Sequence, residues 1–518
     1  MHSTLRNCIY AVSVVALLAG RGVGAENPPA PVATAAASSA VPAPAVPAAG
    51  ALKLSLGEAV LRALERNSSF RVDRLQPAIS QTYEQSARAA FDPTLSAEVS
   101  VSHDRNEVSP HDDSDNTFSR GNGAAAGVGV SQLFPTGTTV EASVERALTD
   151  TEAPLTDTRD RASEYGLTVT QPLLRGAGTA VNLAALRSAR INTRVSKFEL
   201  RGVAETLVAD VETAYWNYIL AADSLSIYSK SVEIAEKQIE ETRERVRLGS
   251  LAETELAAAE AEVAKRQEDL INARGTLATA RLKLVRYLNP GDSLTWNTAI
   301  DLTDKPDSAI LGEVKDVEAH VASGLKNRAD LNQARLQVEL GQIEVVQTRN
   351  GLLPRLDAFV RLGGSLYADS FYLATDRHGE TRDAEAGLRM EHSLFNRDER
   401  ATHDRATYSL EQTRSALVNM EELVQVDVRS AHVEVARAAE QRKATTATRK
   451  LREVAHRAER EKFLVGKSTA LLVAQAWRDL LDSQISEIEA VIAYRKAILN
   501  LYRLDGTLLE QRGVSAQF

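Results

Sequence analysis

Two long stretches of the chain keep a helical hydrophobic period with hardly a helix-breaking residue. They are 181–287 and 397–505. No proline lies between Leu173 and Asn289, and none follows Pro354. Because proline costs a helix interior about 3 kcal/mol and glycine about 1 kcal/mol, each stretch predicts two very long helices that meet at one central glycine. Such helices would reach roughly 100 Å at about 1.5 Å per residue.

The two stretches are copies of one another. A shift of 217 residues places Gly249 on Gly466 and Leu284 on Leu501 without a gap. The segment before each stretch repeats at a shift of 261 residues, which places Pro93 on Pro354. A register held over this length indicates an internal duplication.

The helical segments that open each copy are shorter. Ser55 and Glu58 have the spacing of a capping box, which predicts a helix from there through Arg66. A second helical pattern covers 69–90 and contains Pro77, so we expect a kink that the second copy lacks.

After Pro93 the hydrophobic period changes from 3.6 to 2. Strict alternation of apolar and polar positions predicts strands at about 94–171 and again at about 355–392. One reading is a sandwich layer on a soluble domain. The other is a transmembrane barrel. The chain has only about four to six such strands, and the smallest barrels have about eight, so several chains would have to share one barrel.

The N-terminus has the layout of a secretory signal. Arg6 precedes an apolar core at 9–19, and small residues at 23–25 offer a cleavage site, although a disordered apolar tail is the alternative. Cys8 is the only cysteine of the chain. Prolines and alanines fill 26–51, a composition typical of an extended linker.

These patterns divide the chain into consecutive parts. We expect a signal peptide (1–25), a disordered linker (26–51), a first repeat (52–290), a connector (291–316), a second repeat (317–509) and a tail (510–518).

Composition argues against two other classes of protein. The net charge of −9 disfavours a nucleic-acid partner. The nine histidines show no metal-ligand spacing, and the chain has no nucleophile elbow, phosphate-binding loop or dinucleotide fingerprint. We therefore expect no enzyme, no catalytic residue, no metal and no cofactor.

In the order of its helices and strands and in their duplication, the chain resembles the outer-membrane efflux proteins, the TolC-like channels. The motifs that carry the resemblance are Gln171–Gly176 after the last strand of the first copy, Glu212–Trp216 in the long helix, and the glycine turns at 248–250 and 465–467. The resemblance covers roughly 52–509.

The resemblance implies a mostly α fold with a β-barrel part. Three chains would each give four strands to one outer-membrane barrel, and their hairpins would form a hollow cylinder across the periplasm. Such a homotrimer, placed in outer-membrane lipid of a Gram-negative cell, passively conducts substrates from an inner-membrane transporter and a periplasmic adaptor, in tripartite efflux or type I secretion. The alternative is a periplasmic coiled-coil adaptor or scaffold without a barrel.

The resemblance also assigns sites. The hairpin ends match the family's adaptor-contacting tips: Leu248, Gly249, Ser250, Val465, Gly466 and Lys467. Glu255, six residues after Gly249, matches an acidic gate position and is a candidate gate residue, or one more solvated carboxylate. The second copy has Leu472 and Gln475 where the archetype has gate carboxylates.

The first copy departs from the family pattern in one further place. Phe134–Gly137 makes a good turn between strand-like runs at 123–131 and 138–146, a hairpin that the second copy lacks. Either the barrel is wider than twelve strands or this hairpin folds elsewhere.

Overall fold

A computed structural model describes most of the chain. The described residues are 52–107, 118–153, 156–249, 251–288, 296, 300–305, 316–368 and 377–514. The expected signal peptide and linker, most of the connector, and Ser250 lie outside them.

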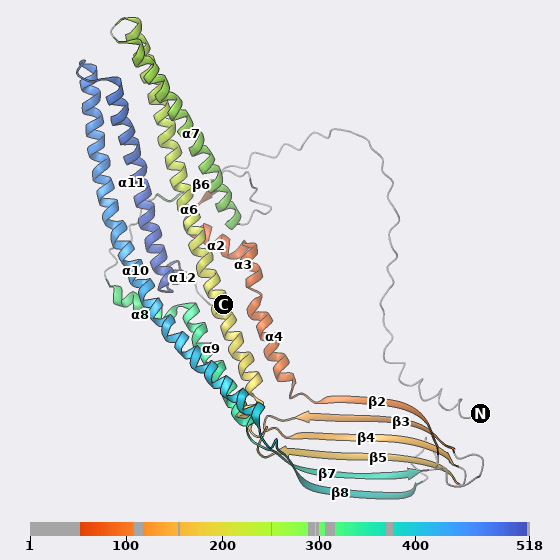
Figure 1. The fold of residues 1–518 in the computed structure, drawn as a ribbon. Helices are drawn as coiled ribbons and strands as arrows, with labels where there is room; N and C mark the ends of the chain where they lie inside the picture. Colours follow the sequence, from red (N-terminus) through yellow and green to blue (C-terminus); the bar gives the residue numbers. More distant parts are fainter. Residues whose placement is uncertain are drawn as a thin grey trace, which may run out of the picture. The chain divides into compact units, whose positions relative to one another are not determined.

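The helices and strands are numbered in chain order, and Figure 1 labels all of them except α5 and β1. The helices are α2 (Leu56–Arg66), α3 (Ser68–Asp73), α4 (Gln76–Ala89), α5 (Thr179–Asn182), α6 (Ala184–Arg247), α7 (Glu253–Leu288), α8 (Val317–Asn327), α9 (Ala329–Gly351), α10 (Arg397–Leu464), α11 (Ala470–Leu504) and α12 (Leu508–Gln511). The strands are β1 (Leu52–Leu54), β2 (Thr94–Glu107), β3 (Phe118–Leu133), β4 (Thr139–Ala153), β5 (Thr156–Pro172), β6 (Ile300–Leu302), β7 (Arg355–Ala368) and β8 (Arg377–Glu391).

Four helices build two long hairpins, as the sequence predicts. α6 has 64 residues and pairs with α7, and α10 has 68 residues and pairs with α11. Further helices lie along them, because α4 and α9 contact α6, and α8 and α9 contact α10. A strand pair that the sequence did not predict, β1 with β6, runs parallel beside the first hairpin.

The short N-terminal helices confirm one expectation and correct another. Ser55 Oγ accepts from the Glu58 amide at 3.3 Å while the Glu58 carboxylate accepts from the Ser55 amide at 2.9 Å, which completes the capping box. The expected kink at Pro77 is wrong. α3 ends at Asp73 and α4 starts at Gln76, so Pro77 lies in a first turn, where its missing N–H leaves no hydrogen bond unmade.

The strands β2, β3, β4, β5, β7 and β8 form one sheet in that order, and all neighbours are antiparallel (Figure 1). The expectation of four strands per chain is therefore wrong. The predicted hairpin around Phe134–Gly137 is β3–β4, and it lies inside the sheet between β2 and β5. Its backbone groups are paired on both sides, which fixes it there.

The sheet has one apolar and one polar face. Cross-strand partners point to the same face, so the register aligns Leu95, Val130, Ala142, Leu167, Leu362 and Ala384 in one row. The neighbouring row on the other face holds Ser96, Gly129, Ser143, Gly166, Gly363 and Asp383. Large apolar side chains are exposed on the first face, with Leu95 at 71%, Val144 at 60% and Leu388 at 69%.

The C-terminal boundary also needs correction. The expected tail begins at 510, but α12 runs from Leu508 to Gln511 and so crosses that boundary. Leu508 and Leu509 are fully buried in the apolar cluster around α2 and α6. Their burial joins the end of the second repeat to the core of the first.

Candidate functional site

The first hairpin tip turns at Gly249. Its φ of +69° lies in the left-handed region, which glycine adopts without a Cβ penalty. The Gly249 amide donates to the Val246 carbonyl at 2.9 Å, and Leu248 beside it is 73% exposed. The third residue predicted for this tip, Ser250, lies outside the described residues.

The second tip is a Schellman turn at Gly466, with a φ of +74°. The Gly466 amide donates to the Phe463 carbonyl at 3.1 Å, and the Lys467 amide donates to the Lys462 carbonyl at 2.8 Å, which satisfies two carbonyls at the helix end. Val465 is 68% exposed. Both tips thus present an apolar side chain just before the glycine.

The two tips lie side by side. The Arg245 guanidinium stands over the Phe463 ring at 5.1 Å from its centroid, and so joins the last turn of α6 to the last turn of α10. Farther from the tips, Arg478 of α11 pairs with Glu262 of α7 at 3.5 Å. The turns at Gly249 and Gly466 therefore lie at the same end of the two hairpins (Figure 1).

Glu255, the candidate gate residue, lies in the first turn of α7, where a carboxylate interacts favourably with the helix dipole. Its Oε2 atom is buried and has no hydrogen-bond partner among the described residues. Its counterpart Leu472 is 46% exposed. A gate role for Glu255 stays a prediction.

An aromatic pair behind the second tip had no sequence signal. The rings of His456 of α10 and Trp477 of α11 lie in contact, with centroids 4.8 Å apart and planes tilted by 53°. Burial, and then the positive charge of Arg460, lower the pKa of His456. The pair depends on the pairing of two helices, so neither residue could be singled out along the chain.

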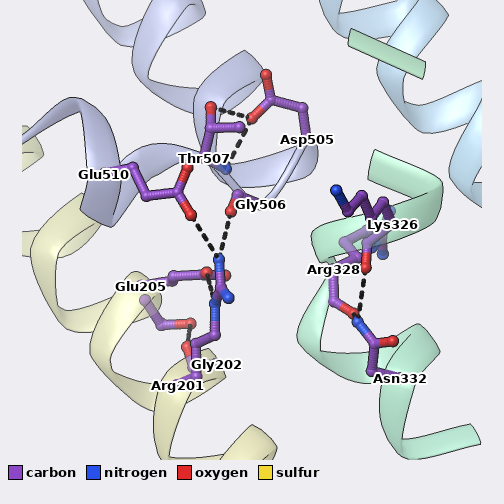
Figure 2. A network of polar contacts seen from close by, with 11 residues as sticks. Arg201, Gly202, Glu205, Lys326, Arg328, Asn332, Asp505, Gly506, Thr507 and Glu510 are labelled. Carbon is purple, nitrogen blue, oxygen red and sulfur yellow. Dashed lines mark hydrogen bonds and ion pairs between the residues drawn. The ribbon is translucent and has the colours of Figure 1, made fainter. Parts of the chain in front are cut away.

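A polar network fastens α6 to the C-terminal segment (Figure 2). Arg201 donates through Nη2 to the Gly506 carbonyl at 2.8 Å and through Nε to Glu205 at 3.0 Å, and its guanidinium lies 3.8 Å from the Glu510 carboxylate. Burial raises the pKa of Glu205, although the bond from Arg201 opposes that shift.

The same network holds the entry to α12. Asp505 accepts from the Thr507 amide at 2.9 Å and from its hydroxyl at 2.6 Å, while His320 of α8 lies 2.6 Å from the other carboxylate oxygen. Beside it Asn332 donates to the carbonyls of Lys326 and Arg328, and so fixes the break between α8 and α9 (Figure 2).

The Glu212–Trp216 motif makes a second set of polar contacts between α6 and the C-terminal segment. Glu212 accepts from Arg512 through both carboxylate oxygens, at 2.6 and 2.9 Å, and from the Trp216 indole at 3.3 Å. Tyr215 donates toward Asp304 at 2.7 Å, and Asp304 also accepts from the Leu56 amide. The motif therefore joins α6, α12 and the residues after β6.

The Gln171–Gly176 motif lies where the sheet meets the helices. The Leu173 amide donates to the Leu356 carbonyl at 2.7 Å, and the Gly176 amide donates to Asn350 at 2.8 Å. Arg175 pairs with Glu399 of α10 at 3.4 Å. The motif ties the first repeat to the second at this junction.

The residues that the structure describes contain no cluster of three or more His, Cys, Asp or Glu side chains suited to a metal ion. None of their helices is both long and apolar enough to cross a membrane.

Known proteins resemble this chain in sequence and in fold. A family model described as outer membrane efflux protein matches residues 139–290 and 321–507. The outer membrane protein TolC of Escherichia coli (strain K12) is 28% identical over 177 residues, and the matched region spans 34% of this chain and 34% of that relative.

Several solved structures share the fold. Among them are the Campylobacter jejuni CmeC outer membrane channel (TM-score 0.64, 14% identity, 88% of this chain and 86% of that one), the open state of the Neisseria gonorrhoeae MtrE outer membrane channel (0.61, 18%, 88% and 89%) and the Vibrio cholerae outer membrane protein VceC (0.63, 14%, 87% and 96%). At these identities the likeness concerns the fold alone.

Proposed function

Because this chain belongs to the outer membrane efflux protein family, we propose that it is the outer-membrane exit duct of a tripartite efflux or type I secretion system. In this proposal it acts as a homotrimer that spans outer-membrane lipid with its sheet and extends its helices into the periplasm. It conducts substrates passively and carries out no catalytic step.

The observation that carries the proposal is the exposed apolar face of the six-stranded sheet. Its strands have 14 to 17 residues, and a transmembrane strand needs about 9–11. A contiguous apolar surface exposed in a single chain marks a membrane or protein contact. The polar face behind it, with Ser, Gly and Glu, suits a water-filled interior.

Exposed apolar side chains on α10 support the assembly with further copies. Val426 is 59% exposed and Val433, seven residues later, is 67% exposed. Seven-residue spacing keeps two positions on nearly the same face of a helix. We assign this face to contact with the next copy in the trimer.

The tips support a docking role for the hairpin ends. Leu248 and Val465 are exposed apolar side chains, and each directly precedes a glycine with a positive φ. We propose that a periplasmic adaptor, coupled to an inner-membrane transporter, contacts these tips. Glu255 lies close behind the first tip in sequence, as a gate residue would.

Fractionation tests the proposed function against the alternative of a periplasmic scaffold. The full chain should be recovered in outer membranes, require detergent for extraction and migrate as a trimer that heating dissociates. A mature chain recovered as a soluble periplasmic monomer would contradict the channel and favour the scaffold.

A further inference from the structure

The sheet has two edges, and a membrane allows neither to stay open. Among the described residues β2 and β8 each pair on one side only. Hydrocarbon offers no hydrogen-bond partner, so an unpaired row of backbone N–H and C=O groups costs several kcal/mol per group. A sheet that spans a bilayer must therefore pair β2 and β8 with something.

The directions of the two edge strands suit each other. With six strands that alternate in direction, β2 and β8 are antiparallel. β2 begins just after α4, and β8 ends just before α10. If β8 of one copy pairs with β2 of the next, the helices of every copy lie beyond the same end of the strands.

The internal repeat supplies the register of this pairing. A shift of 261 residues places β7 on β2, and a shift of 221 residues places β5 on β8, with Gly166 on Gly387 and Leu167 on Leu388. The contact of β5 with β7 inside the chain is thus the duplicate of a contact between β8 and the next copy's β2. In the first contact Leu167 faces Leu362 and Val169 faces Val360.

Transferred through the two shifts, this register sets Leu388 against Val101 and Met390 against Val99. All four side chains are apolar and 58–72% exposed in the single chain, and they lie on the apolar face of their strands. The apolar face of one copy then continues without interruption into the apolar face of the next copy. The sheet edges match a second copy in direction, in register and in the chemistry of the face.

From this geometry we propose that three copies close a barrel of eighteen strands, in which β8 of each copy pairs with β2 of the next and β3–β4 forms part of the wall. The number of copies rests on the proposed function. At about 4.8 Å between strands and a tilt of about 40°, the barrel is roughly 36 Å across, against roughly 24 Å for twelve strands.

Paired cysteines test the edge contact. In a Cys8→Ser background the chain has no other cysteine, so a Val101→Cys, Leu388→Cys variant reports one contact. In outer membranes, oxidation or a short bis-maleimide should link it into dimers and trimers and no larger species. The matched control, Val101→Cys with Arg389→Cys, places the thiols on opposite faces and should give no product.

Labelling tests whether the extra hairpin lies in the barrel wall. Val144→Cys on the apolar face should react with a lipid-partitioning maleimide and resist a water-soluble one. Ser143→Cys, its neighbour on the polar face, should show the reverse preference.

The failures are distinguishable. Reaction of Val144→Cys with the water-soluble reagent in a cross-linked trimer would put the hairpin outside the barrel and overturn eighteen strands, with the channel intact. Absence of the cross-link in a heat-dissociable membrane trimer would overturn the edge pairing alone. Recovery of a soluble monomer would overturn the proposed function as well.

Discussion

Gly137 lies directly against Gly176. A Cβ built on Gly137 would stand 2.4 Å from the Gly176 carbonyl oxygen, and the φ of Gly137 is +93°. This contact joins the turn of the extra β3–β4 hairpin to the segment that leaves β5, and the Gly178 amide adds a hydrogen bond to the Thr136 carbonyl at 3.0 Å. The hairpin is therefore fixed at the junction of sheet and helices.

A Gly137→Ala substitution should destabilise the junction by about 2–3 kcal/mol, because it adds strain at positive φ and forces two backbone segments apart. The heat-induced dissociation of the purified trimer measures this loss. Gly178→Ala is the control, since its φ is +91° but nothing lies within 4 Å of its Cβ. Equal effects of both variants would show that the close contact with Gly176 contributes nothing.

The tips yield a second prediction. Leu248→Glu and Val465→Glu each place a charge in the exposed apolar surface without altering the turn. If that surface docks an adaptor, each variant should weaken adaptor binding about tenfold, equivalent to about 1.4 kcal/mol, while the trimer still inserts. Binding of the partner adaptor to trimers in detergent measures the change.

Gln267→Glu is the matched control for the tip variants, because it adds the same charge at an exposed polar site of α7. It should bind the adaptor like the unmodified protein. Undiminished binding by both tip variants would remove the docking role from this surface.

Local pattern was enough to predict the two long helical hairpins, the capping box and the two glycine turns. Each depends on residues within a few positions of one another, as at Ser55 with Glu58. The apolar and polar faces of the strands were also predicted, since alternation at Leu95–Val101 is a local property. The expected kink at Pro77 was wrong because a proline suits a first turn as well as it disrupts an interior.

Strand number and the long-range fastenings could not be predicted from local pattern. Arg512 binds Glu212 across 300 residues, and no local sequence pattern predicts a contact between residues so far apart in the chain. The extra hairpin did leave a signal, however. The two repeat shifts of 261 and 217 residues differ by 44, and β3 with β4 accounts for most of that insertion. The order of the strands in the sheet depends on which strands pair with one another, and the sequence of a single strand does not determine its partner.

The Glu212–Arg512 pair yields a third prediction. Glu212 is buried, with 3% of its side chain exposed. Loss of one partner of a buried ion pair leaves an uncompensated charge and costs about 3–5 kcal/mol, so Arg512→Met should release α12 and expose the C-terminus to protease. The rate of proteolysis near α12 measures the release.

A double variant serves as the control for this pair. Glu212→Gln with Arg512→Met removes both charges and keeps an oxygen that accepts from the Trp216 indole. It should regain most of the resistance to protease. A double variant as sensitive as Arg512→Met alone would show that the buried charge of Glu212 is not the cause.

The ring contact of His456 with Trp477 yields the fourth prediction, a pH dependence of the second hairpin. The pKa of His456 is lowered from its ordinary value of about 6.5. The unfolded chain therefore binds a proton at a pH where the folded chain does not, and stability rises with pH in that window. As the pH falls below about 6.5, the hairpin behind the second tip should lose stability; above that pH, His456 adds no dependence.

His456→Phe keeps an aromatic ring against Trp477 and removes the titration. The variant should show a smaller fall in the thermal midpoint of helix unfolding between about pH 6.5 and pH 5, as followed by circular dichroism on the trimer in detergent. Because the substitution leaves the other titrating groups in place, the difference between the two profiles reports His456 alone. Parallel profiles for the variant and the unmodified protein would show that protonation of His456 does not weaken this hairpin.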